Sequence, residues 1–233
     1  MTASKKMNVL SLCDYSGAWA KPYADAGHTV FLVDPKHRPA KGEDVWSFED
    51  GMLKCSDTVR GFLNLMKQGW INTNFDVILA APPCTHFASS GARWFKDKDA
   101  DGRTDEAVGI IYDILEIVSM CDPKVFALEN PVGRLERLVP ELSGMKGLMF
   151  NPCDYAGFAD DPDSEAYTKR TCLWGWFNAD LPTAPVEPVF LTASNGDRYA
   201  PLMMKTGGKS ERTKELRSNT PTGFSRAFFR ANG

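Results

Sequence analysis

Residues 75–84, with the sequence FDVILAAPPC, are the best starting point for reading the fold. The first six form a short, mainly apolar run, which is typical of a strand buried in a parallel sheet. Pro82 and Pro83 end the strand, because proline has no N–H to donate and fixes its own φ. Cys84 then follows the carboxyl end of a strand, where ligands bind in open α/β sheets. It is a candidate nucleophile, with a buried structural thiol as the alternative.

Strands and helices alternate on both sides of this segment. Apolar runs predict strands at residues 7–12, 29–33, 75–80 and 124–128. Apolar residues at helical spacing predict helices at 17–26, 58–68 and 107–120, with a closing amphipathic helix at 223–232. Between the last two, residues 188–204 have room for a hairpin or two. The alternation predicts an α/β fold with a doubly wound, mostly parallel sheet.

The composition limits the class of protein. A chain of 233 residues suits one α/β domain with a small appendage. No apolar run reaches membrane-spanning length and residues 1–7 lack the apolar core of a signal peptide, so we expect a cytoplasmic protein. The six cysteines contain no CxxC pair and the three histidines form no cluster, which argues against a metal site or a disulfide framework. The net charge of −3 weakens the case for tight non-specific DNA binding, although only a local patch matters.

The first two predicted strands end in residues that suit a nucleoside cofactor. Gly17 lets a ligand approach the backbone, and the helix expected after it offers free N–H groups. Asp34, at the end of the second strand, suits hydrogen bonds to ribose hydroxyls. The glycine-rich phosphate fingerprint is missing, so S-adenosylmethionine fits better than NAD. The alternative for Asp34 is an ordinary turn aspartate before Pro35.

The fourth predicted strand leads into Glu129 and Asn130, and the topology brings Glu129 to the same rim as Cys84. A thiolate can add to carbon 6 of a pyrimidine while a carboxylic acid hydrogen-bonds the ring nitrogen. A free cysteine has a pKa of about 8.5, so little of it is thiolate at neutral pH. The acid must stay protonated near neutrality, which requires a pKa raised by burial. The alternative for Glu129 is a carboxylate that caps a helix start.

In this order, the residues resemble the DNA cytosine-5 methyltransferase family. Pro82-Pro83-Cys84 matches its Pro-Pro-Cys nucleophile motif, and Glu129-Asn130-Pro131 resembles its Glu-Asn-Val motif. Weaker matches are the aromatic-x-Gly cofactor motif at 15–17, the acidic residue at 34, the Asp-hydrophobic pair at 44–45, part of an arginine-rich strand at 167–171 and the last motif at 218–223. The resemblance spans nearly the whole chain and implies the Rossmann-like fold of S-adenosylmethionine-dependent methyltransferases, with a reduced C-terminal appendage.

The resemblance implies a covalent mechanism on a cytosine that is flipped out of DNA. Cys84 would attack carbon 6, Glu129 would engage the ring nitrogen, and carbon 5 would take the methyl group of S-adenosylmethionine. Residues 85–103 would form a mobile loop that closes on the site, with basic residues that contact phosphates. The expected catalytic residues are Cys84, Glu129 and Arg170; the expected cofactor-binding residues are Tyr15, Ser16, Gly17, Asp34, Asp44, Pro82 and Asn219; the expected substrate-binding residues are Pro83, Asn130, Arg93 and Lys169.

The chain departs from the family pattern in two further places. Ala18 and Trp19 stand where the family has more glycine, and we expect Trp19 in the core. Residues 177–216 are too few for a full target-recognition domain, so sequence specificity should be low. We expect a catalytic and cofactor-binding domain at 1–176, a reduced recognition segment at 177–216 and a returning C-terminal helix at 217–233. Such compactness resembles bacteriophage members of the family, which implies a monomer acting in the cytoplasm of a bacterial host.

Other functions remain open at this point. The substrate could be a free nucleotide or RNA, and the donor could be a modified relative of S-adenosylmethionine. A catalytically inert, nucleic-acid-binding relative is the non-enzyme alternative. A Cys84–His86 hydrolase is disfavoured, because residues two apart in an extended loop point to opposite sides.

Overall fold

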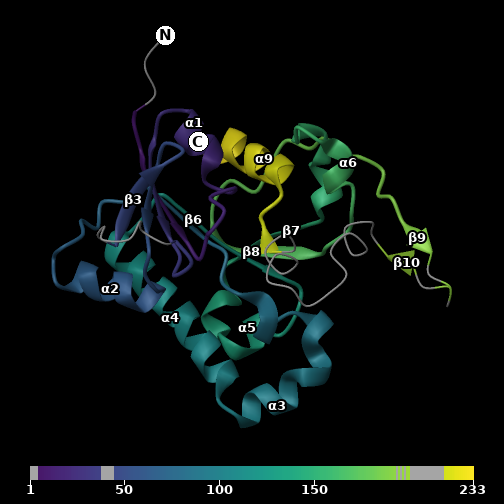
Figure 1. Ribbon diagram of the computed structural model, residues 1–233, viewed down its shortest axis with the longest axis horizontal. Helices are drawn as coiled ribbons and strands as arrows, with labels where there is room; N and C mark the ends of the chain where they lie inside the picture. Colours follow the sequence, from purple (N-terminus) through teal and green to yellow (C-terminus); the bar gives the residue numbers. More distant parts are fainter. Residues whose placement is uncertain (1–4, 38–44, 193, 195, 197, 200–217) are drawn as a thin grey trace.

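The computed structural model describes residues 5–37, 45–192, 194, 196, 198–199 and 218–233 (Figure 1). An eight-stranded sheet has the order β3-β4-β2-β1-β5-β6-β8-β7. Its strands are β1 (Asn8–Leu12), β2 (Thr29–Val33), β3 (Trp46–Glu49), β4 (Met52–Cys55), β5 (Val77–Ala80), β6 (Val125–Pro131), β7 (Lys146–Phe150) and β8 (Thr171–Trp176). A separate hairpin pairs β9 (Leu191–Thr192) with β10 (Arg198–Tyr199).

The direction of the strands creates a switch point in the sheet. β4, β2, β1, β5 and β6 run parallel, whereas β3 and β8 are antiparallel to their neighbours. The chain moves outward from β1 through β2 to β4 and then crosses to β5 on the other side of β1. Ligands of doubly wound sheets bind outside the carboxyl ends of the strands at such a reversal. The expected mostly parallel, doubly wound α/β fold is confirmed.

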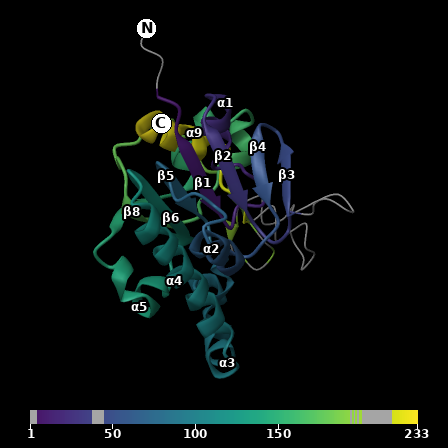
Figure 2. The same cartoon turned by 90° about the vertical axis from the view of Figure 1, so that its left-hand side faces the viewer.

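Helices cover both faces of the sheet, as Figures 1 and 2 show. α2 (Val59–Lys67) and α4 (Arg103–Cys121) pack on one face, against Leu10 and Ile78 among others. α1 (Lys21–Asp25) and α9 (Thr222–Asn232) pack on the other face, against Val9 and Leu79. Successive strand residues therefore fill opposite cores, as the alternation of side chains requires. The shorter helices are α3 (Phe95–Ala100), α5 (Leu135–Leu138) and α6 (Pro162–Glu165), and the 3-10 turns are Cys84–His86, Ser89–Trp94, Pro140–Leu142, Pro152–Asp154 and Ala156–Phe158.

Several elements differ from the expectations. The first helix is only five residues long, because Gly17 has a φ of +69° and belongs to a turn that precedes it. The β3–β4 hairpin was not predicted, since its two short strands carry little apolar signal. β6 continues through Glu129 and Asn130, which pair with Leu173 and Cys172 of β8. The apolar run expected at 124–128 thus forms most of this strand, and its pairing with β8 extends it through the expected end at Glu129-Asn130-Pro131.

The segment 85–103, expected as a loop, is largely helical. It folds into two 3-10 turns and α3 before α4 begins at Arg103. The closing helix is confirmed as α9, and Trp19 is fully buried against its Phe224 and Phe228. No helix in the described part of the chain combines the length and apolar character needed to cross a membrane.

Candidate active site

A cavity of about 450 Å³ lies at the switch point between β1 and β5. Its walls come from the segments that follow β1, β2 and β5, together with the segment that precedes α9. Its volume is in the range of small-molecule sites. The lining residues are Cys13, Asp14, Tyr15, Ser16, Asp34, Lys36, Ala81, Pro83, Cys84, Thr85, Ser218, Asn219 and Thr220.

Asp14 organises the turn that follows β1. Its carboxylate accepts hydrogen bonds from the Gly17 amide (2.7 Å), the Ser16 hydroxyl (3.3 Å) and the Ser11 hydroxyl (2.8 Å). Burial raises the pKa of Asp14, and these three donors oppose that rise. A side chain at Gly17 would crowd Leu32 and would adopt a positive φ, so glycine lets this turn pack on β2.

Asp34 stands at the end of β2 and lines the same cavity. One of its carboxylate oxygens accepts the Lys36 amide at 2.8 Å. The Lys36 ammonium lies 5.8 Å from the centre of the Tyr15 ring, across the cavity mouth. An acid, a cation and an aromatic ring therefore meet at this edge. Asp44, also expected to bind the cofactor, lies outside the described residues.

The nucleophile turn after β5 is attached to β6 by buried contacts. The Asn130 side chain is fully buried and donates to the Pro82 carbonyl at 2.9 Å. Gly133, just beyond β6, forms a bridge with Ala88, and a methyl group there would collide with the Phe87 carbonyl oxygen. These contacts hold Cys84 beside the end of β6.

Cys84 and Glu129 share Lys169 as a charged neighbour, and the charge of Glu129 also affects Cys84. Burial raises the pKa of Cys84, the Lys169 ammonium lowers it, Glu129 raises it and Lys98 lowers it. Burial also raises the pKa of Glu129, and Lys169 opposes that rise. The carboxyl group is thus biased toward its neutral form, as an acid facing a nucleophile requires.

Of the neighbouring Lys169 and Arg170, Lys169 is the one whose charge lowers the pKa of both Cys84 and Glu129. The side chain of Arg170 is exposed, and its guanidinium contacts the Met149 sulfur at 2.9 Å. Burial raises the pKa of Tyr167, two residues before Lys169, and the nearby charges of Glu165 and Glu129 add to that rise.

The segment that leads into α9 forms one wall of the cavity. The start of α9 is fixed by Glu165, which lies much earlier in the chain. The buried carboxylate of Glu165 accepts hydrogen bonds from the Thr222 amide (2.6 Å), the Thr222 hydroxyl (2.7 Å) and the Gly223 amide (2.9 Å). A carboxylate at a helix start is favourable because it meets free N–H groups. This cap places Ser218, Asn219 and Thr220 at the wall of the cavity.

The structure gathers most of the expected site residues but not all. Tyr15, Ser16, Asp34, Pro83, Cys84 and Asn219 line the cavity, with Glu129 and Lys169 next to Cys84. Pro82 faces a smaller cavity with His86 and Arg103, and Arg93 is exposed on the 3-10 turn before α3. The assignments missed Asp14, Lys36, Ser218 and Thr220. Their signal is position alone, since each lies within two residues of an expected site residue.

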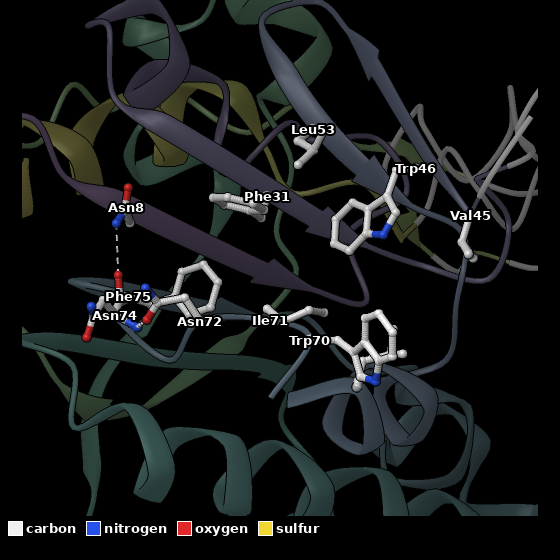
Figure 3. Close-up of a pocket in the computed structure, with 11 residues that line it drawn as sticks. Asn8, Phe31, Val45, Trp46, Leu53, Trp70, Ile71, Asn72, Asn74 and Phe75 are labelled. Atoms are coloured by element: carbon white, nitrogen blue, oxygen red, sulfur yellow. Dashed lines mark hydrogen bonds between the residues drawn. The ribbon is translucent and has the colours of Figure 1, made fainter. Parts of the chain in front are cut away.

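A second cavity of about 440 Å³ lies between the β3-β4-β2-β1 half of the sheet and the end of α2 with the segment that follows it. Figure 3 shows Trp46 and Trp70 on its opposite walls, with Phe31 and Ile71 deeper inside. The residues described around it include no acid, base or thiol, so it lacks groups for proton transfer or nucleophilic attack. Within the described ranges, no group of three or more His, Cys, Asp or Glu residues is placed to hold a metal ion.

The fold and site together define an α/β protein with a ligand cavity at the sheet's switch point and a cysteine at the cavity's rim. Residues 55–137 match the family model of C-5 cytosine-specific DNA methylases. The match covers Cys84, Glu129 and the strands that carry them. This segment is similar to that family.

A curated relative agrees with the family match. A probable DNA (cytosine-5)-methyltransferase of Frog virus 3 (isolate Goorha) is 30% identical over 108 residues, which are 43% of this chain and 45% of that protein. The chain thus matches less than half the length of this relative.

Two solved structures also resemble the chain. One is described as a DNA modification methyltransferase encoded within a prophage (E. coli), with 16% identity, 72% of this chain and 46% of that chain covered, and a TM-score of 0.46. The other is an S-adenosylmethionine-dependent methyltransferase from Agrobacterium tumefaciens, with 19% identity, 75% and 57% covered, and a TM-score of 0.39. The fold assignment rests on the strand order and not on these similarities.

Proposed function

We propose that this protein transfers a methyl group from S-adenosylmethionine to carbon 5 of cytosine in DNA, with Cys84 as the covalent nucleophile. The observation that carries the proposal is the placement of Cys84 beside Glu129, at a cavity on the switch point of the sheet. Both residues lie in the segment that matches the cytosine-specific methylase family.

The chemistry of the cavity fits S-adenosylmethionine. Asp34 would accept the ribose hydroxyls, because a carboxylate that accepts one amide keeps further lone pairs. The hydroxyls of Ser16 and Thr220 and the amide of Asn219 offer donors and acceptors to the polar amino-acid part. When bound, the cofactor supplies an activated methyl group.

The chain's own residues would prepare the cytosine. The base must leave the DNA stack to reach Cys84. The Cys84 thiolate forms a bond to carbon 6, and electron density moves toward the ring nitrogen. Glu129 in its acid form donates a hydrogen bond to that nitrogen and stabilises the developing charge. After carbon 5 has gained the methyl group, loss of its proton to a base expels Cys84 and restores the aromatic ring.

The first test is to incubate the protein with S-adenosylmethionine and unmodified DNA, digest the DNA to nucleosides and weigh them by mass spectrometry. We expect deoxycytidine to gain one methyl group with the wild type and with Cys121→Ala, a half-buried cysteine on α4. Cys84→Ala should fold but show no turnover. Wild-type turnover in Cys84→Ala would refute the covalent mechanism, and no methylation by a cofactor-bound wild type would refute DNA as substrate.

A free nucleotide or RNA is the second candidate substrate. The observation that favours it is the small size of segment 177–216, in which the hairpin β9–β10 is the sheet structure described. The same incubation with cytidine triphosphate and with RNA distinguishes these substrates from DNA. A modified donor would appear as an added mass other than one methyl group.

A further inference from the structure

One lysine of the 85–103 segment is buried, although its neighbours are exposed. Lys98 of α3 is 7% exposed, whereas Lys96, Asp97 and Asp99 face solvent. Its ammonium donates to the main-chain carbonyl of Thr85 at 2.5 Å. Burial of a charged amine is unfavourable unless the surroundings compensate for lost water, so this position calls for an explanation.

The segment that carries Lys98, residues 85–104 with α3, is held in place by Arg134. Arg134 follows β6 and is itself buried. Its guanidinium donates two hydrogen bonds of 2.7 Å to Asp99, one of 2.9 Å to Thr104 and one of 3.0 Å to the His86 carbonyl. It also lies 3.7 Å from the centre of the Phe95 ring. The guanidinium lowers the pKa of Asp99 to about 2, so this pair stays charged at neutral pH.

The hydrogen bond to Thr85 puts the Lys98 ammonium against the nucleophile turn, one residue beyond Cys84. The charges that face Cys84 are Lys169 and Lys98, which favour the thiolate, and Glu129, which opposes it. The charges that face Lys98 are Arg103 and Arg134, which together with burial lower its pKa, and the Cys84 thiolate and Asp101, which raise it. Lys98 and the Cys84 thiolate therefore stabilise each other's charged forms.

We propose that Lys98 is a positioning residue for the nucleophile. Its ammonium fixes the Cys84 turn by donating a hydrogen bond to the Thr85 carbonyl. Its positive charge also stabilises the thiolate that forms when the thiol proton passes to solvent. Arg134 holds α3 so that this contact is maintained. The proposal deepens the proposed function, since it concerns the same cysteine. It replaces the expectation that Lys98, as one of the basic residues of this segment, contacts phosphate.

The test measures the reactivity of Cys84 in the full chain without cofactor or DNA. Iodoacetamide labels the protein over a range of pH, and peptide mass spectrometry reports the alkylation of each cysteine separately. We expect Lys98→Met to move the midpoint for Cys84 to higher pH and to slow its alkylation at pH 7.5 by about threefold to tenfold, because the thiolate fraction falls. Lys98→Arg should restore most of the rate.

Controls separate this role from a purely structural one. Lys96→Met removes an exposed charge from the same helix and should leave the Cys84 midpoint unchanged. Cys121 should keep its wild-type profile in all variants. If Lys98→Met fails to fold, Arg134→Lys keeps Lys98 but loosens α3, and it should shift the Cys84 midpoint in the same direction.

An unchanged Cys84 midpoint in a folded Lys98→Met variant would overturn the proposal. Alkylation needs no substrate, so this result is independent of whether the protein methylates DNA. If Lys98→Met shifts the Cys84 midpoint as expected while the wild type does not methylate DNA, the result counts against the proposed function alone.

Discussion

At Glu129 the proposed chemistry depends on a proton. Burial raises the pKa of this carboxyl group, so the folded chain holds its proton more tightly than the unfolded chain does. The associated stability is complete below the unfolded value near 4.5 and is lost as the pH rises through the folded pKa. At high pH the buried carboxyl group ionises, and its contribution to the stability of the folded chain is lost.

Glu129→Gln should remove this dependence. We expect the variant to gain stability relative to the wild type as the pH rises, with no such gain at acid pH, in urea unfolding across the pH range. Asp14 and Asp34 also have pKa values raised by burial, but both the wild type and the variant contain them, so their contributions cancel in the difference.

Glu129→Gln should also lower turnover by about 10²-fold or more, which is the contribution of a positioned acid. A stability difference that does not vary with pH would contradict the assignment.

At the scale of elements, the start of α9 depends on α6. Pro221 precedes the helix and provides no side-chain cap, so the Glu165 carboxylate takes that role from a distant part of the chain. We expect Glu165→Ala to lower the free energy of unfolding by about 1–2 kcal/mol, the typical value of a lost cap. Cofactor affinity should fall as well, because Ser218 to Thr220 line the cavity just before the helix.

The control for this change is Asp163→Ala, an exposed residue of the same short helix. It should alter stability by less than about 0.5 kcal/mol, as surface substitutions usually do. Chemical denaturation and calorimetry with S-adenosylmethionine measure the two effects. Equal losses in both variants would show that the cap is not what fixes α9.

At the scale of the whole molecule, the segment expected to recognise DNA is short. The eight-stranded sheet and the lining of the cavity come from residues outside segment 177–216. We expect methylation at cytosines in many sequence contexts, because few residues remain to read base edges. Sequencing of methylated sites on a long natural DNA measures this. Methylation confined to one long, strict recognition sequence would contradict it.

Much of the fold and part of the site could be predicted from local sequence patterns. The apolar runs predicted β1, β2, β5 and β6, and the two prolines placed Cys84 after a strand. Parallel strands then required Cys84 and Glu129 to share one rim. The β3–β4 hairpin could not be predicted because its two short strands carry little apolar signal, and the pairing of β6 with β8 could not because the two strands lie far apart along the chain.

Local patterns are therefore enough to predict the class of fold and to place a thiol and a carboxyl group at the ends of two strands, which a parallel sheet brings to one rim. The charges that surround this pair follow from the three-dimensional packing. Lys169 lies near the pair, whereas the Arg170 guanidinium contacts Met149. Lys98 is buried on α3, which Arg134, just beyond β6, holds in place through Asp99. Such choices depend on distances between residues remote in sequence, and burial changes the energy of each charge in ways that no local pattern encodes.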